Sequence, residues 1–426
     1  MKKAAVILLY IVVFALPSFA EEIDTTLTVD RREKEESLGH KLMTVPSFLV
    51  SVPVKITRGF TYFVVEDIAL SKPVRKAASL FGRVDLDWSL YPIIGYGSNS
   101  GLKAGLTFNS KNTFTKGERF KLKGSYSTYN YQDYSFQYTA PNKLGPFKRL
   151  YLSYRYRERP RDSFYGLGNE SRDYNEVAVN CEENKVGLGW YHVLTEQTRL
   201  NFDFSYRNIN VYNGEDPDVE GDLNLIEQEL NLHPTVLRPS RVWSFGIGVA
   251  SDSRNHPGQT SSGGHYLFSF DYNKGVGVSD DLEYWTIRGD LWRFINLFKK
   301  RILVLRVLVE STDRPKDKPL LPYYLRGKLG GQEDLRGYLN NRFVDNDLFM
   351  YSVEYRYPIW DVVDAFLFFN EGRVFTSITD NFSLDDLHYS GGFGFRIWNN
   401  RGLLLSTTFC ISEEKPRFYL QFSDYF

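Results

Sequence analysis

The stretch 149–157, RLYLSYRYR, decides the fold because its side chains alternate between apolar and polar along its length. One face carries the apolar and aromatic residues Leu150, Leu152, Tyr154 and Tyr156. The opposite face carries the polar residues Ser153, Arg155 and Arg157. A period of two indicates a β-strand with one apolar side and one wet side.

The same alternation recurs as far as the last residues of the chain, and no helical pattern interrupts it to supply a second layer. We read sixteen strands, an even number that suits a barrel whose two ends meet on one side of the membrane. They are 101–109, 117–129, 132–140, 148–158, 173–181, 184–194, 197–209, 241–252, 264–274, 282–292, 300–311, 349–358, 361–374, 388–397, 401–411 and 416–425. The sequence therefore predicts an all-β fold, a transmembrane antiparallel β-barrel of 16 strands over 101–426.

The composition agrees with a barrel in the outer membrane of a bacterial cell. Aromatic residues make up 16% of the chain, with 29 Tyr and 32 Phe, whereas mean hydropathy is only −0.36. A barrel has this combination because its lipid face is apolar, its lumen is polar and aromatic girdles mark both interfaces. The 52 basic and 52 acidic residues balance, so no field for nucleic acid is predicted.

The N-terminal part has a different pattern. Residues 1–20 combine a basic start, an apolar run and the small-x-small site Ser18-Phe19-Ala20, which predicts a signal peptide. Residues 21–100 contain a charge run and several prolines, and we expect a short periplasmic segment with possible amphipathic helices or a partly ordered linker.

The predicted strands also assign the connections to two sides. The two longest connections, 210–240 and 312–348, fall on the extracellular side, and the short ones at 359–360 and 398–400 fall on the periplasmic side. The connection 159–172 is longer than expected for the periplasmic side on which this scheme puts it.

Five stretches carry a resemblance to one family. They are GGQEDLRGY at 330–338, FFNEGRVF at 368–375, SDSRNHPGQTSSGGHY at 251–266, FYGLGNES at 164–171 and YPIIGYGSNSGLKAG at 91–105. The chain resembles the BamA/TamA-type superfamily of outer-membrane proteins, the bacterial surface antigen barrels. The last stretch is similar to the start of the family's first strand, and the 251–266 stretch to a periplasmic turn.

The resemblance implies a functional loop in the lumen. Its loop-motif residues, which would anchor the loop, are Gly330, Gly331, Arg336, Gly337 and Tyr338. Its partners on the barrel wall would be Glu354, Asn370 and Gly372.

Position 370 departs from the family pattern, because family members carry an aspartate there and this chain carries a neutral asparagine. Asn370 keeps a hydrogen-bond acceptor for Arg336 but removes one negative charge. Strand alternation independently turns Glu354 and Asn370 inward and Glu371 outward.

The resemblance further implies a role in inserting or translocating proteins or lipids. Its expected partners are outer-membrane lipid and either client outer-membrane proteins or a separate periplasmic protein. Family members that assemble proteins carry periplasmic POTRA domains, and the proline-broken segment 21–100 lacks their pattern, so we expect a barrel-only member.

The sequence also bears on two other functions. A passive pore is favoured by basic residues on the predicted lumenal face, namely Lys103, Lys121, Lys123, Arg155 and Arg157. An enzyme is not predicted, because none of the six histidines lies in a recognisable hydrolase motif. No cofactor or metal site is predicted, and Cys181 and Cys410 are expected to be isolated.

Overall fold

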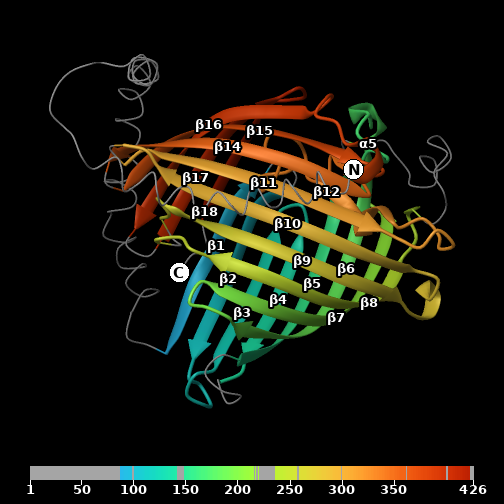
Figure 1. Ribbon diagram of the computed structural model, residues 1–426, viewed down its shortest axis with the longest axis horizontal. Coiled ribbons are helices and arrows are strands. Elements are labelled where there is room, and N and C mark those ends of the chain that lie inside the picture. Colours follow the sequence, from blue (N-terminus) through green and yellow to red (C-terminus); the bar gives the residue numbers. More distant parts are fainter. Residues whose placement is uncertain are drawn as a thin grey trace. The chain divides into compact units, whose positions relative to one another are not determined.

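The computed structural model contains a closed barrel of sixteen antiparallel strands (Figure 1). It describes residues 87–422 apart from 98–99, 142–147, 215, 217–218, 220–235, 257–258, 299, 361 and 400–401. The predicted all-β fold and strand number are confirmed. The predicted signal peptide at 1–20 and the predicted segment as far as residue 86 lie outside the described residues.

Each barrel strand pairs with its neighbours in chain order, and β18 closes the ring on β1. The strands are β1 Trp88–Gly97, β2 Gly101–Lys111, β3 Arg119–Ser127, β4 Gln132–Thr139, β5 Lys148–Phe164, β6 Val177–Val193, β7 Thr198–Asn213, β8 Ser240–Asp252, β9 Gly263–Gly275, β10 Glu283–Asn296, β11 Ile302–Asp313, β14 Asp347–Trp360, β15 Val363–Phe375, β16 His388–Asn399, β17 Gly402–Ser412 and β18 Arg417–Phe422.

The predicted start of the barrel at residue 101 was wrong, because β1 precedes it. Pro92 interrupts the β1 segment, and apolar residues occupy both of its faces, so the alternation that marks other strands is weak there. The 91–105 stretch that resembles the start of a first strand in fact contains most of β1 and the beginning of β2.

The predicted strands 173–181 and 184–194 form one strand, β6. β5, β6 and β7 have 17, 17 and 16 residues, more than the ~9–11 that cross a bilayer. Within β6 the run Glu182–Asn184 puts polar residues on both faces, which is typical of a turn and led to the prediction of two strands. The predicted number of strands is still sixteen, because β1 was missed and β6 was counted twice.

The four longest connections lie at one end of the barrel, which we call the long-loop end. They are 165–176, 214–239, 314–346 and 376–387. The connection after β5 therefore lies on the same side as 214–239 and 314–346, whereas the predicted scheme put it on the opposite side. The error followed from dividing β6, which inverted the direction assigned to every earlier strand.

The outer and inner faces of the wall follow the pleat of each strand. In β8 the apolar residues Trp243, Phe245 and Ile247 are exposed on the outer face, whereas Ser244 and Gly246 face the lumen. Exposed apolar residues repeat on nearly every strand, as a lipid-facing belt requires. No helix among the described residues is long and apolar enough to cross a membrane.

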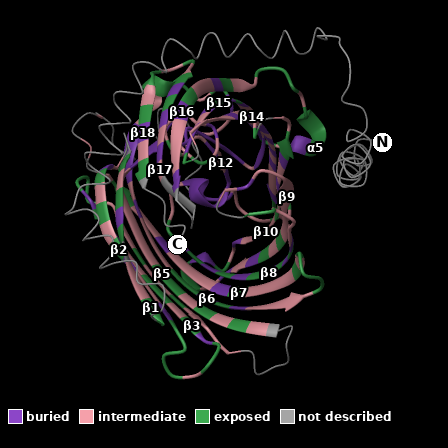
Figure 2. Cartoon of the chain, turned by 90° about the vertical axis from the view of Figure 1, so that its left-hand side faces the viewer, coloured by how far each residue is buried: buried purple, intermediate pink, exposed green. Residues whose placement is uncertain are grey.

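The connection 314–346 folds back inside the ring of strands, and we call it the lumenal loop. It contains the 3-10 helix η5 Tyr323–Leu325 and the two-stranded sheet β12 Gly327–Leu329 and β13 Phe343–Asp345. Figure 2 shows β12 within the ring, near β14 to β16.

Two apolar clusters hold the lumenal loop. In one, Leu321 and Tyr323 pack against inward-facing residues near the ends of β5 to β8 and β10. In the other, Leu329 and Leu335 pack with inward-facing residues of β11, β14 and β15. Burial of these large side chains on both sides gives the loop a defined position in the lumen. Outside the barrel wall, the short helix α5 Ile378–Asn381 lies in the connection 376–387.

Candidate functional site

The glycines of the loop motif adopt backbone conformations that other residues rarely take. Gly330, Gly331 and Gly337 have φ of 122°, 99° and 99°. A Cβ on Gly337 would also lie 3.2 Å from the Cβ atoms of Ser390 and Ser412, which belong to β16 and β17. Glycine is therefore required at position 337 both by the backbone and by the close approach to the wall.

Arg336 lies at the tip of the lumenal loop with its guanidinium against β14 and β15. Its Nη1 donates to Glu354 Oε2 at 3.1 Å, and its Nη2 lies 3.5 Å from Ser352 Oγ. In either orientation of its amide, Asn370 accepts a hydrogen bond from Arg336, from Nη2 at 3.4 Å or from the backbone N–H at 3.3 Å. The predicted loop residue and both predicted polar wall partners therefore lie together.

Two further arginines share Glu354 with Arg336. Arg356 Nε donates to Glu354 Oε1 at 2.8 Å, and Arg396 donates to both carboxylate oxygens at 2.5 and 3.0 Å. Arg356 lies on β14 and Arg396 on β16, so one carboxylate joins two strands and the loop. The side chain of Glu354 is only 6% exposed, which makes these charge-assisted bonds strong and their loss costly.

Two phenylalanines face the lumen beside these arginines. The guanidinium of Arg336 lies 3.9 Å from the ring centre of Phe368, and that of Arg396 lies 4.0 Å from the ring centre of Phe366. Such stacking adds a cation–π attraction to the ion pairs. Space for the rings comes from Gly392 and Gly394 on β16, where an added Cβ would lie 3.0 and 2.4 Å from ring atoms.

Sequence reasoning missed the contribution of Phe366, Phe368 and Arg396. An aromatic residue on an inward position of a barrel strand contradicts the expected apolar-out pattern. Phe366 and Phe368 pair with Gly394 and Gly392 directly across on β16. Inward aromatic residues opposite glycines are the sequence signal from which these two positions could have been predicted.

Tyr338 extends the site to the end of the barrel sheet. Its hydroxyl donates to Glu413 Oε2 at 2.9 Å or to the carbonyl of Tyr389 at 3.1 Å. The Gly337 carbonyl accepts from Ser412 Oγ at 2.9 Å and from Arg417 Nε at 3.1 Å. Because Arg417 lies on β18, the loop holds the last strand of the barrel from inside.

The opposite side of the loop tip is bound to β10 and β11. Arg306 donates to the Glu333 carbonyl at 2.6 Å and forms an ion pair with Asp334 at 3.1 Å. The same guanidinium makes two bonds to Asp290, at 2.9 and 2.8 Å. These contacts were not predicted. Together with those of Arg336 and Gly337 they make the loop tip a bridge from β10 and β11 to β17 and β18.

Gly372 makes room for the loop's short sheet. It lies on the inner face of β15, where an added Cβ would be 2.7 Å from Leu329 Cδ2 and 3.1 Å from the Phe349 carbonyl. The predicted wall glycine Gly372 therefore makes its close approach to Leu329 of β12, and not to Arg336.

The 164–171 stretch also contacts the lumenal loop. The Gly168 N–H donates to the Val344 carbonyl at 2.8 Å, and Arg342 binds the hydroxyl and carbonyl of Ser171 at 3.0 and 2.9 Å. The stretch 164–171 also meets the stretch 368–375, because the backbone N–H of Val374 donates to Asn169 Oδ1 at 3.3 Å.

The strand pair that closes the barrel, β1 with β18, has a shorter register than the neighbouring pair β1 with β2. Among the described residues, β1 and β18 pair only at Gly95 with Gln421 and Tyr96 with Leu420. By comparison β1 pairs with β2 along ten residues, from Trp88 to Gly97. The β1–β18 seam therefore has few of the backbone hydrogen bonds that join the rest of the wall.

Comparison with known families agrees with this architecture. A family model described as the Omp85 superfamily domain matches residues 112–423. The chain belongs to the Omp85 superfamily. The predicted membership of the BamA/TamA group of barrels is thereby confirmed, and Omp85 barrels such as BamA and CdiB are bacterial outer-membrane proteins. A search of curated protein sequences found no match.

Three solved Omp85 structures share the fold at low sequence identity. BamA from Haemophilus ducreyi lacking POTRA domains 1–3 has a TM-score of 0.56 and 16% identity, covering 79% of this chain and 69% of that one. CdiB from Acinetobacter baumannii has a TM-score of 0.51 and 13% identity, covering 79% of this chain and 60% of that one. CdiB from Escherichia coli has a TM-score of 0.54 and 11% identity, covering 80% of this chain and 63% of that one. The chain thus spans less than two thirds of either CdiB protein.

Proposed function

We propose that this Omp85 barrel helps to insert proteins into the outer membrane or to pass them across it by opening the β1–β18 seam. The short register of the seam among the described residues is the observation that carries the proposal, because separating the two residue pairs seen there costs far less than separating ten. An opened β1 would present the free backbone groups to which another strand can pair.

The contacts of the lumenal loop favour different roles for the two seam strands, because the loop is bound to β18. β18 is held from inside by Gly337 through Arg417 and by Gln332 through Gln421, the latter at 2.9 Å. β18 is also paired with β17 along six residues. In the proposed mechanism β18 therefore stays in place while β1 moves away and exposes its edge to a client strand.

A crosslink across the seam tests this proposal. In a background with Cys181→Ala and Cys410→Ala, Gly95→Cys with Gln421→Cys would form a disulfide between two lumen-facing paired positions. The assay is insertion of a urea-unfolded outer-membrane barrel protein into liposomes that contain the purified full chain. We expect the oxidised protein to lose most activity and reduction to restore it.

The matched control joins β1 to β2 at Ser89 and Asn109, a pair that seam opening leaves intact. This crosslink should not reduce insertion. Full activity of the oxidised Gly95–Gln421 protein would exclude a working seam.

A passive pore is the second candidate, and the polar lumenal cavity between β5 and β10 favours it. The cavity has a volume of about 490 Å³ and is lined by Lys185, Asp203 and Arg207, among other polar residues. The lumenal loop argues against a continuously open channel, because its apolar residues pack tightly against the wall.

A further inference from the structure

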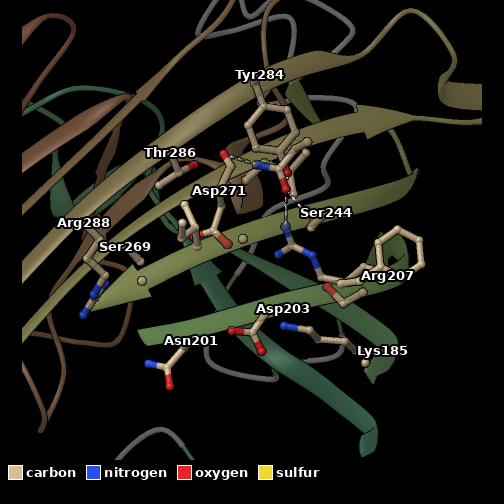
Figure 3. A pocket seen from close by; sticks show the side chains of 18 of the residues that line it. Lys185, Asn201, Asp203, Arg207, Ser244, Ser269, Asp271, Tyr284, Thr286 and Arg288 are labelled. Atoms are coloured by element: carbon tan, nitrogen blue, oxygen red, sulfur yellow. Dashed lines mark hydrogen bonds between the residues drawn. The ribbon is translucent and has the colours of Figure 1, made fainter. Parts of the chain in front are cut away.

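Two adjoining cavities lie in the lumen between the β5–β10 wall and the lumenal loop. Figure 3 shows the larger one, with Lys185, Asp203 and Arg207 along one side and Arg288 on another. The smaller has a volume of about 300 Å³ and shares Arg207 and Arg288 with the larger. Figure 3 also shows that Arg207 is turned towards Tyr284, whose hydroxyl accepts from its Nη2 at 3.2 Å.

The smaller cavity is strongly basic. Its basic lining residues are Arg157, Arg159, Arg207, Arg288, Arg326 and Lys328. Its acidic lining residues are Glu183 and Glu310. Six basic and two acidic side chains leave a formal excess of four positive charges around a space large enough for a small anion.

Three of these basic residues have no carboxylate within ion-pair distance among the described residues. Within the described part of the chain, the hydrogen bonds of Arg207 go to the neutral groups Asn273 and Tyr284, and its buried Nε has no partner. Lys328 Nζ lies 5.3 Å from the ring centre of Tyr323, and among the residues that the structure describes Arg157 forms no ion pair. By contrast, Arg288 is paired with Glu310 at 2.6 Å and Arg159 with Asp162 at 3.1 Å.

Glu183 attracts Arg157 and Arg207 only from beyond ion-pair distance, and cations removed from bulk water without a close anion are costly. Burial lowers the pKa of Lys328, and repulsion from Arg159 lowers it further. An arginine cannot escape the cost in this way because it stays protonated in proteins. The guanidinium fork also matches the oxygen geometry of a phosphate group, and an ammonium adds a point charge beside it.

We propose that this cavity binds a small multivalent anion of the phosphate class through Arg157, Arg207 and Lys328. The three residues come from β5, β7 and β12, so the bound anion would tie the lumenal loop to the wall at a further place, away from Arg336. The site is independent of the β1–β18 seam and of the function proposed above.

The test uses the purified full chain folded in detergent micelles, with inorganic pyrophosphate as the probe. Calorimetric titration should show binding, and pyrophosphate should raise the unfolding temperature, read as heat-modified gel mobility, above that in sodium chloride of equal ionic strength. Arg157→Gln and Lys328→Gln should each weaken binding at least about tenfold, as expected when a charge-assisted contact is lost.

Two matched variants separate a built site from a general effect of charge. Lys121→Gln removes a cation from the lumenal side of β3, outside the cavity lining, and should bind pyrophosphate as the unchanged protein does. Lys328→Arg keeps the charge and should retain binding, which also shows whether position 328 tolerates replacement.

Absence of a binding heat, or equal stabilisation by pyrophosphate in the Lys121→Gln, Arg157→Gln and Lys328→Gln proteins, would overturn the proposal. Pyrophosphate binding to the oxidised seam-crosslinked protein should be unchanged. Failure of the anion site and failure of the seam mechanism are therefore distinguishable.

Discussion

At the level of single residues, Glu354 is the centre of the lumenal site. One buried carboxylate receives hydrogen bonds from Arg336, Arg356 and Arg396, and these side chains belong to the lumenal loop, β14 and β16. Asn370 adds a neutral acceptor beside Arg336. The cluster holds one acid for three guanidiniums, so its stability depends mainly on Glu354.

Replacing Glu354 by glutamine should strongly destabilise the barrel, because three buried cations lose their carboxylate. The expected loss of unfolding free energy is ~3–5 kcal/mol, as when one partner of a buried ion pair is removed. Denaturant unfolding in detergent, followed by tryptophan fluorescence, measures it. Glu371→Gln is the control: it lies on the outer face of β15 and bonds to Tyr351, so a change of ~1 kcal/mol is expected. Equal losses in the two variants would contradict the central role of Glu354.

The opposite change is expected at position 370. Asn370→Asp supplies a second carboxylate beside Arg336 and reduces the excess positive charge of the cluster. Hydrogen bonds to a charged acceptor are about twice as strong as neutral ones, so we expect a gain of ~1 kcal/mol in unfolding free energy. The same denaturant titration measures it. A loss of stability would show that the cluster does not require more negative charge.

At the level of elements, the lumenal loop holds its place through shape as well as charge. β12 and β13 form a small sheet that packs on the inner face of β15, and Leu329 occupies the space left by Gly372. Because the loop tip contacts β10 and β11 on one side and β17 and β18 on the other, its docking affects strands far apart in the wall.

Gly372→Val should release this sheet, because the new side chain would overlap Leu329 and approach the Phe349 carbonyl. Overpacking of this kind costs ~1–3 kcal/mol. Trypsin should then cut the loop after residues such as Lys328 and Arg336, which the fragment masses would identify. Gly391→Val on β16 is the control, since a Cβ there meets only ordinary contacts at 3.5 and 3.8 Å. Similar cleavage of both proteins would argue against the space-filling role of Gly372.

At the level of the whole molecule, the barrel combines a weakly paired seam with a lumen that the loop partly fills. The passive-pore hypothesis requires a continuous path through the lumen, whereas the seam hypothesis does not. The two hypotheses therefore differ in what they expect of the resting protein in a membrane.

In a planar bilayer we expect the unmodified barrel to be mostly closed, because the lumenal loop is packed against the wall through two apolar clusters. Arg336→Ala removes the loop's bond to Glu354 and should increase both the frequency and the size of openings. Steady conductance by the unmodified protein, unchanged by Arg336→Ala, would favour the passive pore over the seam mechanism.

Much of the fold could be predicted from the alternation of side chains, because the pleat of a strand turns successive residues to opposite faces. Strands such as β8 obey this rule clearly. β1 does not, since Pro92 and apolar residues on both faces conceal the period. β6 was divided because the run Glu182–Asn184 inside it is polar on both faces. The position of Arg336 beside Glu354 and Asn370 could be predicted only by combining inward strand positions with the family resemblance.

The sequence by itself determined the strand periodicity, the lipid-facing and lumen-facing sides and the inward positions of Glu354 and Asn370, because these follow from local backbone geometry. Only the tertiary structure decided which strands close the barrel, that Arg356 and Arg396 share Glu354 with Arg336, and that Arg157, Arg207 and Lys328 surround one cavity. Those contacts join residues far apart in the chain, and they depend on the register and closure of the whole sheet, which no local pattern encodes.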